Sequence, residues 1–300
     1  MSPKKGIERK RGNRLGFWIF RIAAKVFGLR GAYGLLYFVS LYYLIFDRAA
    51  VAASMAYVKR RFPDHGALRQ RFDVYLLFVS QGKCLIDRYY VAAGGRDIDL
   101  ELIGYEKLQE HLVDGKKGMI LLTAHVGNWQ IATTALQHLG RTVYLMMRPE
   151  DNAAVKEALN IDAEKDAVRI LYTDGSLGGV VEALKAISEG GVVSIMGDRT
   201  YGYASIEASL LGENVRFPYG AFSLAAAARC PVAVLLSAKV GTNKYHTDVS
   251  QVIAPPAGVR GKKEAEIKAC VQEFARILEA YAVRYPYQWF VFRDMWQGND

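Results

Sequence analysis

One histidine in this chain stands where it could act as a general base. His125 follows an apolar run, residues 119–124, and the segment 126–139 then has the pattern of a helix. Active groups of open α/β sheets gather at the carboxyl ends of strands, where such a residue would lie. A neutral imidazole at that point can take a proton from a hydroxyl or an amine. The sequence therefore predicts a catalytic base at position 125.

Gln130 is the polar side chain that could steady this imidazole. Two positions five residues apart on a regular helix lie about 140° from each other, so they do not share a face. Gln130 can meet His125 only if the histidine precedes the first helical turn, and the pair Gly127-Asn128 eases that geometry. An amide oxygen can accept the imidazole N–H and fix its tautomer, but it offers no full negative charge.

The chain beyond residue 100 alternates between strand and helix patterns. We expect strands at 119–124, 142–147, 192–196, 231–238 and 245–253, and helices at 126–139, 152–159, 177–188, 222–228 and 262–284. Strands separated by helices favour an α/β fold whose mostly parallel, mixed sheet is covered by helices. No internal repeat or low-complexity linker interrupts it, so residues 49–300 are predicted to form one domain.

Residues 1–48 differ in character from that domain. The first fourteen are rich in lysine and arginine, which is typical of a disordered basic tail. Residues 31–46 carry no charge, and their tyrosines suit a membrane interface, although a full span needs about 20 residues. We expect a basic tail and a membrane-anchoring helical region; the alternative is a pair of helices packed on the soluble domain. A secretory signal is disfavoured because no small-residue cleavage site stands out.

Composition and missing motifs exclude several classes of function. The formal net charge of +9 suits nucleic acid, anionic lipid or an acidic protein. The basic residues concentrate near the N-terminus without a recognisable nucleic-acid-binding motif, so we expect no nucleic-acid partner. Gly-x-Ser-x-Gly, P-loop and Rossmann glycine patterns are missing from the sequence, which disfavours hydrolases, nucleotide-binding proteins and dehydrogenases. The other histidines lack partners at metal spacing, and neither a metal nor a cofactor is expected.

Five segments of the chain together resemble one known family, in the same order. They are Ala124–Gln130, Tyr144–Pro149, Gly190–Arg199, Leu211–Gly220 and Pro286–Trp296. The first resembles the H-x4-D/E block of the lysophospholipid acyltransferase superfamily, and the set is most similar to the bacterial lipid A lauroyl/myristoyl acyltransferase branch. The hydrophobic N-terminus agrees as well, so the resemblance covers nearly the whole chain.

The resemblance implies acyl transfer without a covalent enzyme intermediate. An acceptor hydroxyl or amine would lose its proton to His125 and attack a thioester carbonyl. The family has an acidic residue where this chain has Gln130, which is a departure from the pattern. Asp198, at the end of another predicted strand, is the best candidate to supply the missing charge. The alternative is a catalytically impaired homologue that acts as a binding or scaffold protein in lipid assembly.

The resemblance also implies a set of substrate-binding residues. They are Asn128, Trp129, Arg148, Arg199, Gly212, Phe217 and Pro218. Arg148 and Arg199 end strands on the same predicted rim, and guanidinium matches phosphate on an acceptor lipid or on a carrier's pantetheine arm; an ordinary surface ion pair is the alternative. The glycine, phenylalanine and proline would shape a loop over the site or form a structural turn. Asn128 and Trp129 would cap the helix or line the acyl channel.

The expected partners follow from the same resemblance. The donor would be an acyl carrier protein or coenzyme A thioester, and the strongly acidic carrier protein suits a chain of net charge +9. The acceptor would be a membrane lipid or glycolipid, as in lipid A biosynthesis, and the anionic membrane surface a further partner. The expected location is the bacterial cytoplasmic (inner) membrane, with the active site facing the cytoplasm.

Overall fold

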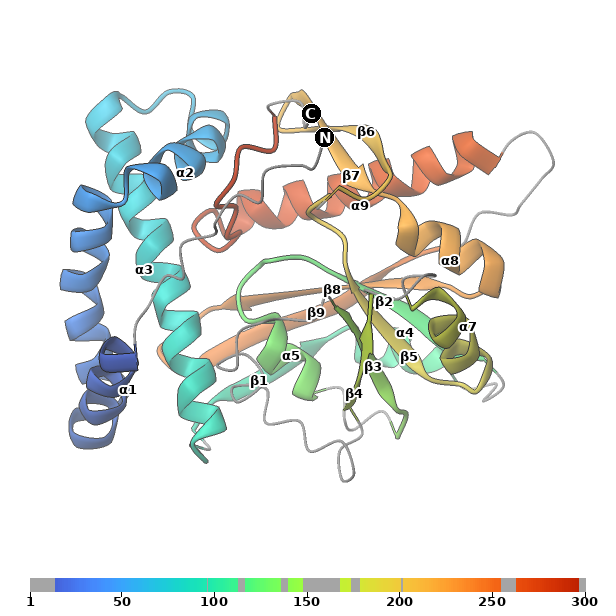
Figure 1. The fold of residues 1–300 in the computed structure, drawn as a ribbon, viewed down its shortest axis with the longest axis horizontal. Helices are drawn as coiled ribbons and strands as arrows, with labels where there is room; N and C mark the ends of the chain where they lie inside the picture. The colour runs from blue at the N-terminus through green and yellow to red at the C-terminus, as the bar shows by residue number, and fades with distance from the viewer. Residues whose placement is uncertain are drawn as a thin grey trace, which may run out of the picture.

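A seven-stranded sheet forms the centre of the molecule (Figure 1). The computed structural model describes residues 14–95, 97–112, 117–135, 140–147, 168–173, 179–200, 202–254 and 263–296. Within these residues the strand order is β1-β9-β8-β2-β5-β3-β4. The strands span Asp99–Ile103 (β1), Met119–Thr123 (β2), Val143–Met147 (β3), Val168–Tyr172 (β4), Val192–Met196 (β5), Val232–Lys239 (β8) and Lys244–Ile253 (β9). All neighbours pair in parallel except β8 and β9, which confirms the predicted α/β fold with a mostly parallel, mixed sheet.

The central strands are buried on both faces, which explains their continuous apolar sequences. All five residues of β2 are buried. Ile120 and Leu122 point into the larger core, which α8 (Gly220–Ala228) and α9 (Lys263–Arg284) cover. Leu121 points to the opposite face, towards Leu108 on α4 (Tyr105–Glu110). The helices thus cover both faces and leave the strand ends free to carry a site.

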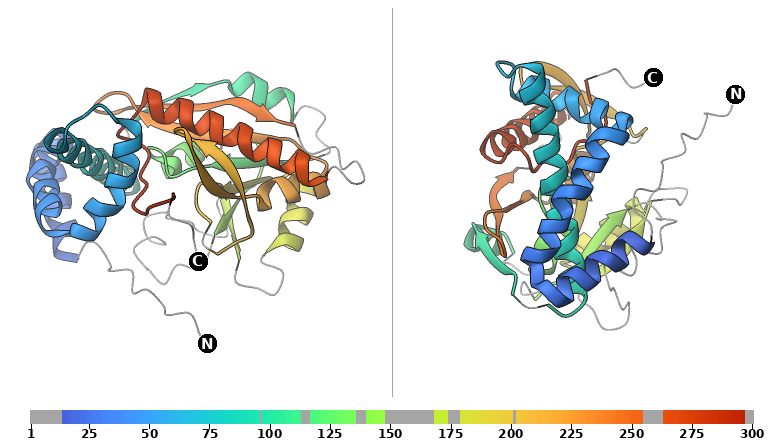
Figure 2. Two further views of the ribbon diagram at one scale, coloured as in Figure 1. Left: turned by 90° about the horizontal axis from the view of Figure 1, so that it is seen from above. Right: turned by 90° about the vertical axis from the view of Figure 1, so that its left-hand side faces the viewer.

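A separate hairpin, β6 (Ser205–Leu210) and β7 (Glu213–Pro218), lies against α9 (Figure 2). The Gln272 side chain on α9 exchanges hydrogen bonds with the backbone N–H and carbonyl of Ser209, at 2.9 and 3.1 Å. The Leu211 N–H donates to the Glu279 carboxylate at 2.7 Å. This segment, predicted to form either a loop over the site or a structural turn, is a strand pair fastened to a helix.

Three helices precede the sheet: α1 (Arg14–Phe46), α2 (Arg48–Arg61) and α3 (Ala67–Ala92). Figure 2 shows α1 and α3 side by side along one side of the molecule. α1 is interrupted at Gly28, whose φ of 66° is not helical. By length and composition, Val26–Phe46 could cross a membrane, and only 22% of it is buried. It exposes large apolar side chains, among them Phe38, Tyr42 and Phe46.

The predicted elements agree with the described ones to within a few residues. The expected helix after His125 is α5 (Trp129–Ala135), which begins three residues later than the pattern indicated. The helix expected near 180 is α7 (Val180–Ser188). The helix expected at 152–159, and Arg148, lie outside the described residues. β1, β4 and α4 were not predicted.

Candidate active site

The register of two neighbouring strands brings His125 and Asp198 together. β2 pairs with β5 in parallel, with Thr123 opposite Met196. Two residues further along each chain stand His125 and Asp198. The two side chains meet through imidazole Nδ1 and carboxylate Oδ1 at 2.8 Å, and the backbone N–H of His125 donates to Oδ2 at 2.9 Å. The carboxyl edge of the sheet thus carries a histidine–aspartate pair.

The turn after His125 requires a glycine. Gly127 has a φ of +54°, and a Cβ there would lie 2.0 Å from the carbonyl oxygen of Ser237. The next residue, Asn128, is buried; its side-chain oxygen accepts from the Ile131 N–H at 3.4 Å. This is an N-cap contact, so His125 precedes the first turn of α5. The Asn128 amide nitrogen donates to the Cys84 carbonyl at 2.8 Å, which leaves the side chain occupied in holding the loop.

A segment near the end of the chain, residues 285–296, closes over this loop; we call it the C-terminal segment. Its Phe290 N–H donates to the His125 carbonyl, and its Gln288 carbonyl accepts from Gly127, both at 2.8 Å. Between them, the Trp289 indole N–H donates to Asp198 Oδ2 at 3.0 Å. Trp289 is fully buried and packs edge-on against Tyr57. Trp289 was not among the predicted site residues, although it stands in one of the five matching segments.

Asp198 is completely buried, yet its carboxylate is well supplied with donors. Burial by itself would raise the pKa of this carboxyl. The neighbouring His125 and Arg199, together with the hydrogen bonds from His125, overcome that effect and hold the pKa of Asp198 well below its usual range. Asp198 is therefore ionised at neutral pH and accepts three hydrogen bonds, two from His125 and one from Trp289.

The hydrogen bonds also select the tautomer of His125. An ionised carboxylate only accepts, so in the neutral ring Nδ1 is the protonated nitrogen and Nε2 is the one with the lone pair. Within the described residues Nε2 has no hydrogen-bond partner, and the imidazole side chain is 23% exposed. A histidine in this state can accept a proton from a molecule that approaches Nε2.

Gln130 does not hold the imidazole. It is half-buried in the first turn of α5, and no hydrogen bond joins it to His125 in the described part of the chain. The carboxylate on Nδ1 belongs to Asp198, which stands two residues after the end of the adjacent strand β5. Trp129, the first residue of α5, is likewise half-buried.

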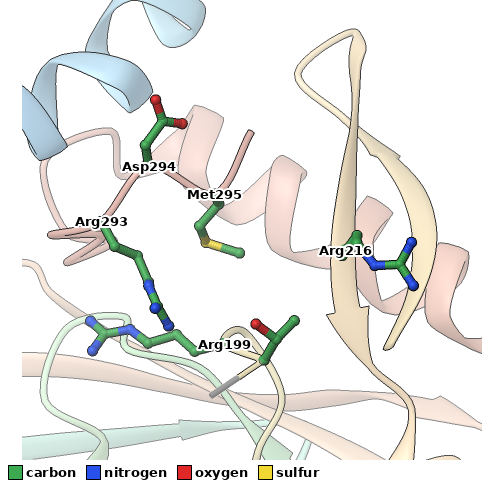
Figure 3. Close-up of a pocket in the computed structure, with 6 residues that line it drawn as sticks. Arg199, Arg216, Arg293, Asp294 and Met295 are labelled. Carbon is green, nitrogen blue, oxygen red and sulfur yellow. The ribbon is translucent and has the colours of Figure 1, made fainter. Parts of the chain in front are cut away.

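Arg199 lies beside the pair, at a small pocket of about 10 Å³. Arg199, Arg216, Arg293 and Asp294 line it, and Figure 3 shows Arg293 reaching towards Arg199 while Arg216 comes from the hairpin. One Arg199 nitrogen donates to the Phe290 carbonyl at 2.7 Å, which ties it to the C-terminal segment. The pocket has room for about one water molecule, so an acyl chain does not fit in it.

The remaining predicted residues, Gly212, Phe217 and Pro218, lie in the hairpin of β6 and β7. Gly212 forms the turn between β6 and β7 with a φ of +80°, while Pro218 ends β7 at the opposite end of the hairpin. Phe217 is fully buried in the core and packs edge-on against Phe274, with ring centroids 6.0 Å apart. Gly212 therefore forms the structural turn that the sequence left open as the alternative, and Phe217 is a core residue.

The chain matches a known family over most of its length. Residues 91–298 match the bacterial lipid A biosynthesis acyltransferases, and the chain belongs to this family. It is accordingly an acyltransferase of lipid biosynthesis, as the five segments predicted. The match begins well after residue 49, where we expected the domain to begin. No curated protein matches the sequence.

The chain also shows a weak similarity to solved structures. The 1-acyl-sn-glycerophosphate (LPA) acyltransferase PlsC from Thermotoga maritima has 14% sequence identity and a TM-score of 0.35. The similarity covers 82% of this chain and 93% of that one. Because this structural similarity is low, the family assignment rests on the sequence match alone.

Proposed function

We propose that this protein transfers a fatty acyl group from a thioester to a hydroxyl or amine of a membrane lipid or glycolipid, with His125 as the general base. The observation that carries the proposal is the histidine–aspartate pair at the carboxyl edge of the sheet, with Nδ1 bound to Asp198. In the proposed reaction, the acceptor gives its proton to Nε2 as its oxygen or nitrogen attacks the thioester carbonyl. The thiolate of the donor leaves, and the proton on the imidazole returns to it.

Asp198 stabilises the imidazolium that forms in this step. The carboxylate is buried, ionised and 2.8 Å from Nδ1, so its attraction for the developing positive charge is only weakly screened. This arrangement supplies the charge that Gln130 lacks. It therefore favours an active enzyme over an impaired scaffold protein.

The N-terminal helices support a location at the bacterial inner membrane. The apolar half of α1 is largely exposed, which is unfavourable in water and favourable against lipid. The net charge of +9 suits the cytoplasmic, anionic leaflet and an acidic acyl carrier protein as donor. Coenzyme A thioesters are the alternative donor. On this proposal residues 1–48 are the anchor and residues 49–300 the acyltransferase domain, with Arg199 near the acceptor.

The test measures acyl transfer by the purified protein. The protein is incubated with total bacterial membrane lipid and with a labelled acyl thioester, either on acyl carrier protein or on coenzyme A, and acylated lipids are identified by mass spectrometry. His125→Ala should lower the rate by about 10²–10⁴-fold. His111→Ala, an exposed histidine, is the control and should leave the rate unchanged. Equal activity of H125A and the wild type would remove His125 as the base, and no product from the wild type would favour the scaffold role.

A further inference from the structure

A second pocket lies where the N-terminal helices meet the end of β8. Its volume is about 280 Å³. Residues that line it include Tyr33, Ser80, Lys83, Lys239, Thr242 and Gln288. We call it the Lys83 pocket. Gln288 also accepts the Gly127 N–H through its carbonyl, so the pocket shares a wall with the loop that carries His125.

The floor of the Lys83 pocket is a buried and fully paired carboxylate. Asp87 is 0% exposed and accepts from the Lys239 ammonium and from the hydroxyls of Tyr33 and Tyr245. Lys239 donates in addition to the Thr242 carbonyl at 2.6 Å. Burial, and then the charge of Asp87, raise the pKa of the Tyr33 hydroxyl far above its usual range, so this group stays a donor. The charges of Asp87 and Lys239 cancel, and the floor is neutral and rigid.

The mouth of the pocket carries a positive charge that nothing in the described chain neutralises. The Lys83 ammonium lies 5.5 Å and 5.2 Å from the ring centroids of Tyr33 and Tyr37, and it donates to the Tyr37 hydroxyl at 3.1 Å. Among the described residues no carboxylate forms an ion pair with it. Ser80 precedes Lys83 by three residues on α3, so both side chains share a face of that helix. A hydroxyl and an ammonium side by side are donors for a phosphate group.

We propose that the Lys83 pocket binds the phosphate headgroup of a membrane lipid. α1 indicates why the ligand is a lipid rather than a free anion. Its Tyr33 lines the pocket, its Tyr37 contacts Lys83, and the same helix goes on to expose Phe38 and Tyr42. A phosphate held by Lys83 and Ser80 leaves its acyl chains beside that apolar face. The pocket is large enough for part of the glycerol or sugar that carries the phosphate. This site is independent of the chemistry at His125.

The test is binding of the full-length chain to vesicles. Phosphatidylcholine vesicles that contain phosphatidic acid, a phosphate monoester, are compared with vesicles that contain phosphatidylglycerol, a diester. Lys83→Gln should weaken binding to the phosphatidic acid vesicles by about tenfold, since one charge-assisted hydrogen bond is lost. Lys83→Arg should retain most of the affinity. Lys185→Gln makes the same charge change on α7, where this lysine side chain is 75% exposed, and should leave binding unchanged.

A second variant separates the pocket from general surface charge. Thr242→Trp keeps every charge but fills the mouth, and it should reproduce the loss caused by Lys83→Gln. Wild-type binding by both variants would overturn the proposal, as would an equal loss caused by Lys185→Gln, which would mean that general surface charge holds the vesicles. Inorganic phosphate is the other probe: if it raises the unfolding temperature of the wild type but not of K83Q while vesicle binding is unchanged, the ligand is a soluble phosphate and the lipid assignment is wrong. His125→Ala should bind like the wild type, so this test and that of the proposed function fail separately.

Discussion

Replacing Asp198 by asparagine tests the arrangement around His125 most directly, because the change keeps shape and removes one acceptor. The carboxylate uses Oδ2 for two donors, the His125 backbone and the Trp289 indole, and Oδ1 for the imidazole N–H. Asparagine has only one acceptor oxygen. If the oxygen occupies the Oδ2 position, it satisfies both buried donors, and the amide NH₂ faces His125. If it occupies the Oδ1 position, the NH₂ meets two N–H groups.

The second orientation is unfavourable by about 1–3 kcal/mol for each donor left buried without an acceptor. The first orientation therefore prevails, and Nδ1 of His125 must become the acceptor. The proton moves to Nε2, which then has no lone pair for the substrate. In serine proteases the corresponding wrong tautomer lowers the rate by about 10⁴-fold. We expect a similar loss here, which corresponds to about 5 kcal/mol on the activation barrier.

The assay is kcat/KM for acyl transfer, combined with ¹⁵N NMR of His125 to identify the protonated ring nitrogen. Asp198→Asn should move the proton from Nδ1 to Nε2. Asp73→Asn is the matched control, since Asp73 is also fully buried and contacts Nδ1 of a histidine, His65, at 2.7 Å. Asp73→Asn should lower the free energy of unfolding far more than it lowers the rate of acyl transfer. More than about a tenth of the wild-type activity in D198N, or an unchanged tautomer, would refute the reasoning.

Four further outcomes are expected. Trp289→Phe removes one donor to Asp198, and kcat should fall by about 10- to 100-fold with little change in KM; a pure KM effect would contradict a positioning role. Gln130→Ala should retain at least about a tenth of the rate, and Gln130→Glu all of it or more, measured by the same transfer assay. Replacing Phe38 and Tyr42 by serine should weaken vesicle flotation more than tenfold, since each buried aromatic contributes about 1.5–3 kcal/mol; unchanged flotation would exclude this anchor. The lowered pKa of Asp198 stabilises the fold above about pH 4, so the difference in unfolding free energy between the wild type and D198N should shrink on acidification.

The sequence predicts the centre of the sheet better than its edges. β2, β5 and β8 are continuous apolar runs because helices cover both of their faces. β1 reads Asp-Leu-Glu-Leu-Ile and lies at one edge, where an exposed face admits charges and weakens the pattern. β4 lies at the other edge. Such strands are defined by the neighbour with which they pair, and this neighbour is distant in the sequence.

The sequence likewise predicts one part of the candidate site and not the other. The position of His125 follows from a local pattern, a strand that gives way to a helix. Its pairing with Asp198 follows from the adjacency of β2 and β5, which local patterns do not reveal because β3 and β4 intervene in the sequence. The Trp289 contact depends on the return of the C-terminal segment to the histidine loop through a short antiparallel bridge between Val126 and Trp289. Only the tertiary structure brings these residues together.

The glutamine at position 130 therefore has a different meaning in the structure than in the sequence. In the sequence alone, Gln130 suggests that the imidazole of His125 lacks a carboxylate partner. In the fold, Nδ1 is already bound to Asp198, and within the described residues Gln130 makes no hydrogen bond to His125, so the pair does not need a carboxylate at position 130. Asp198 alone gives the histidine one fixed tautomer, which is the state that a general base requires.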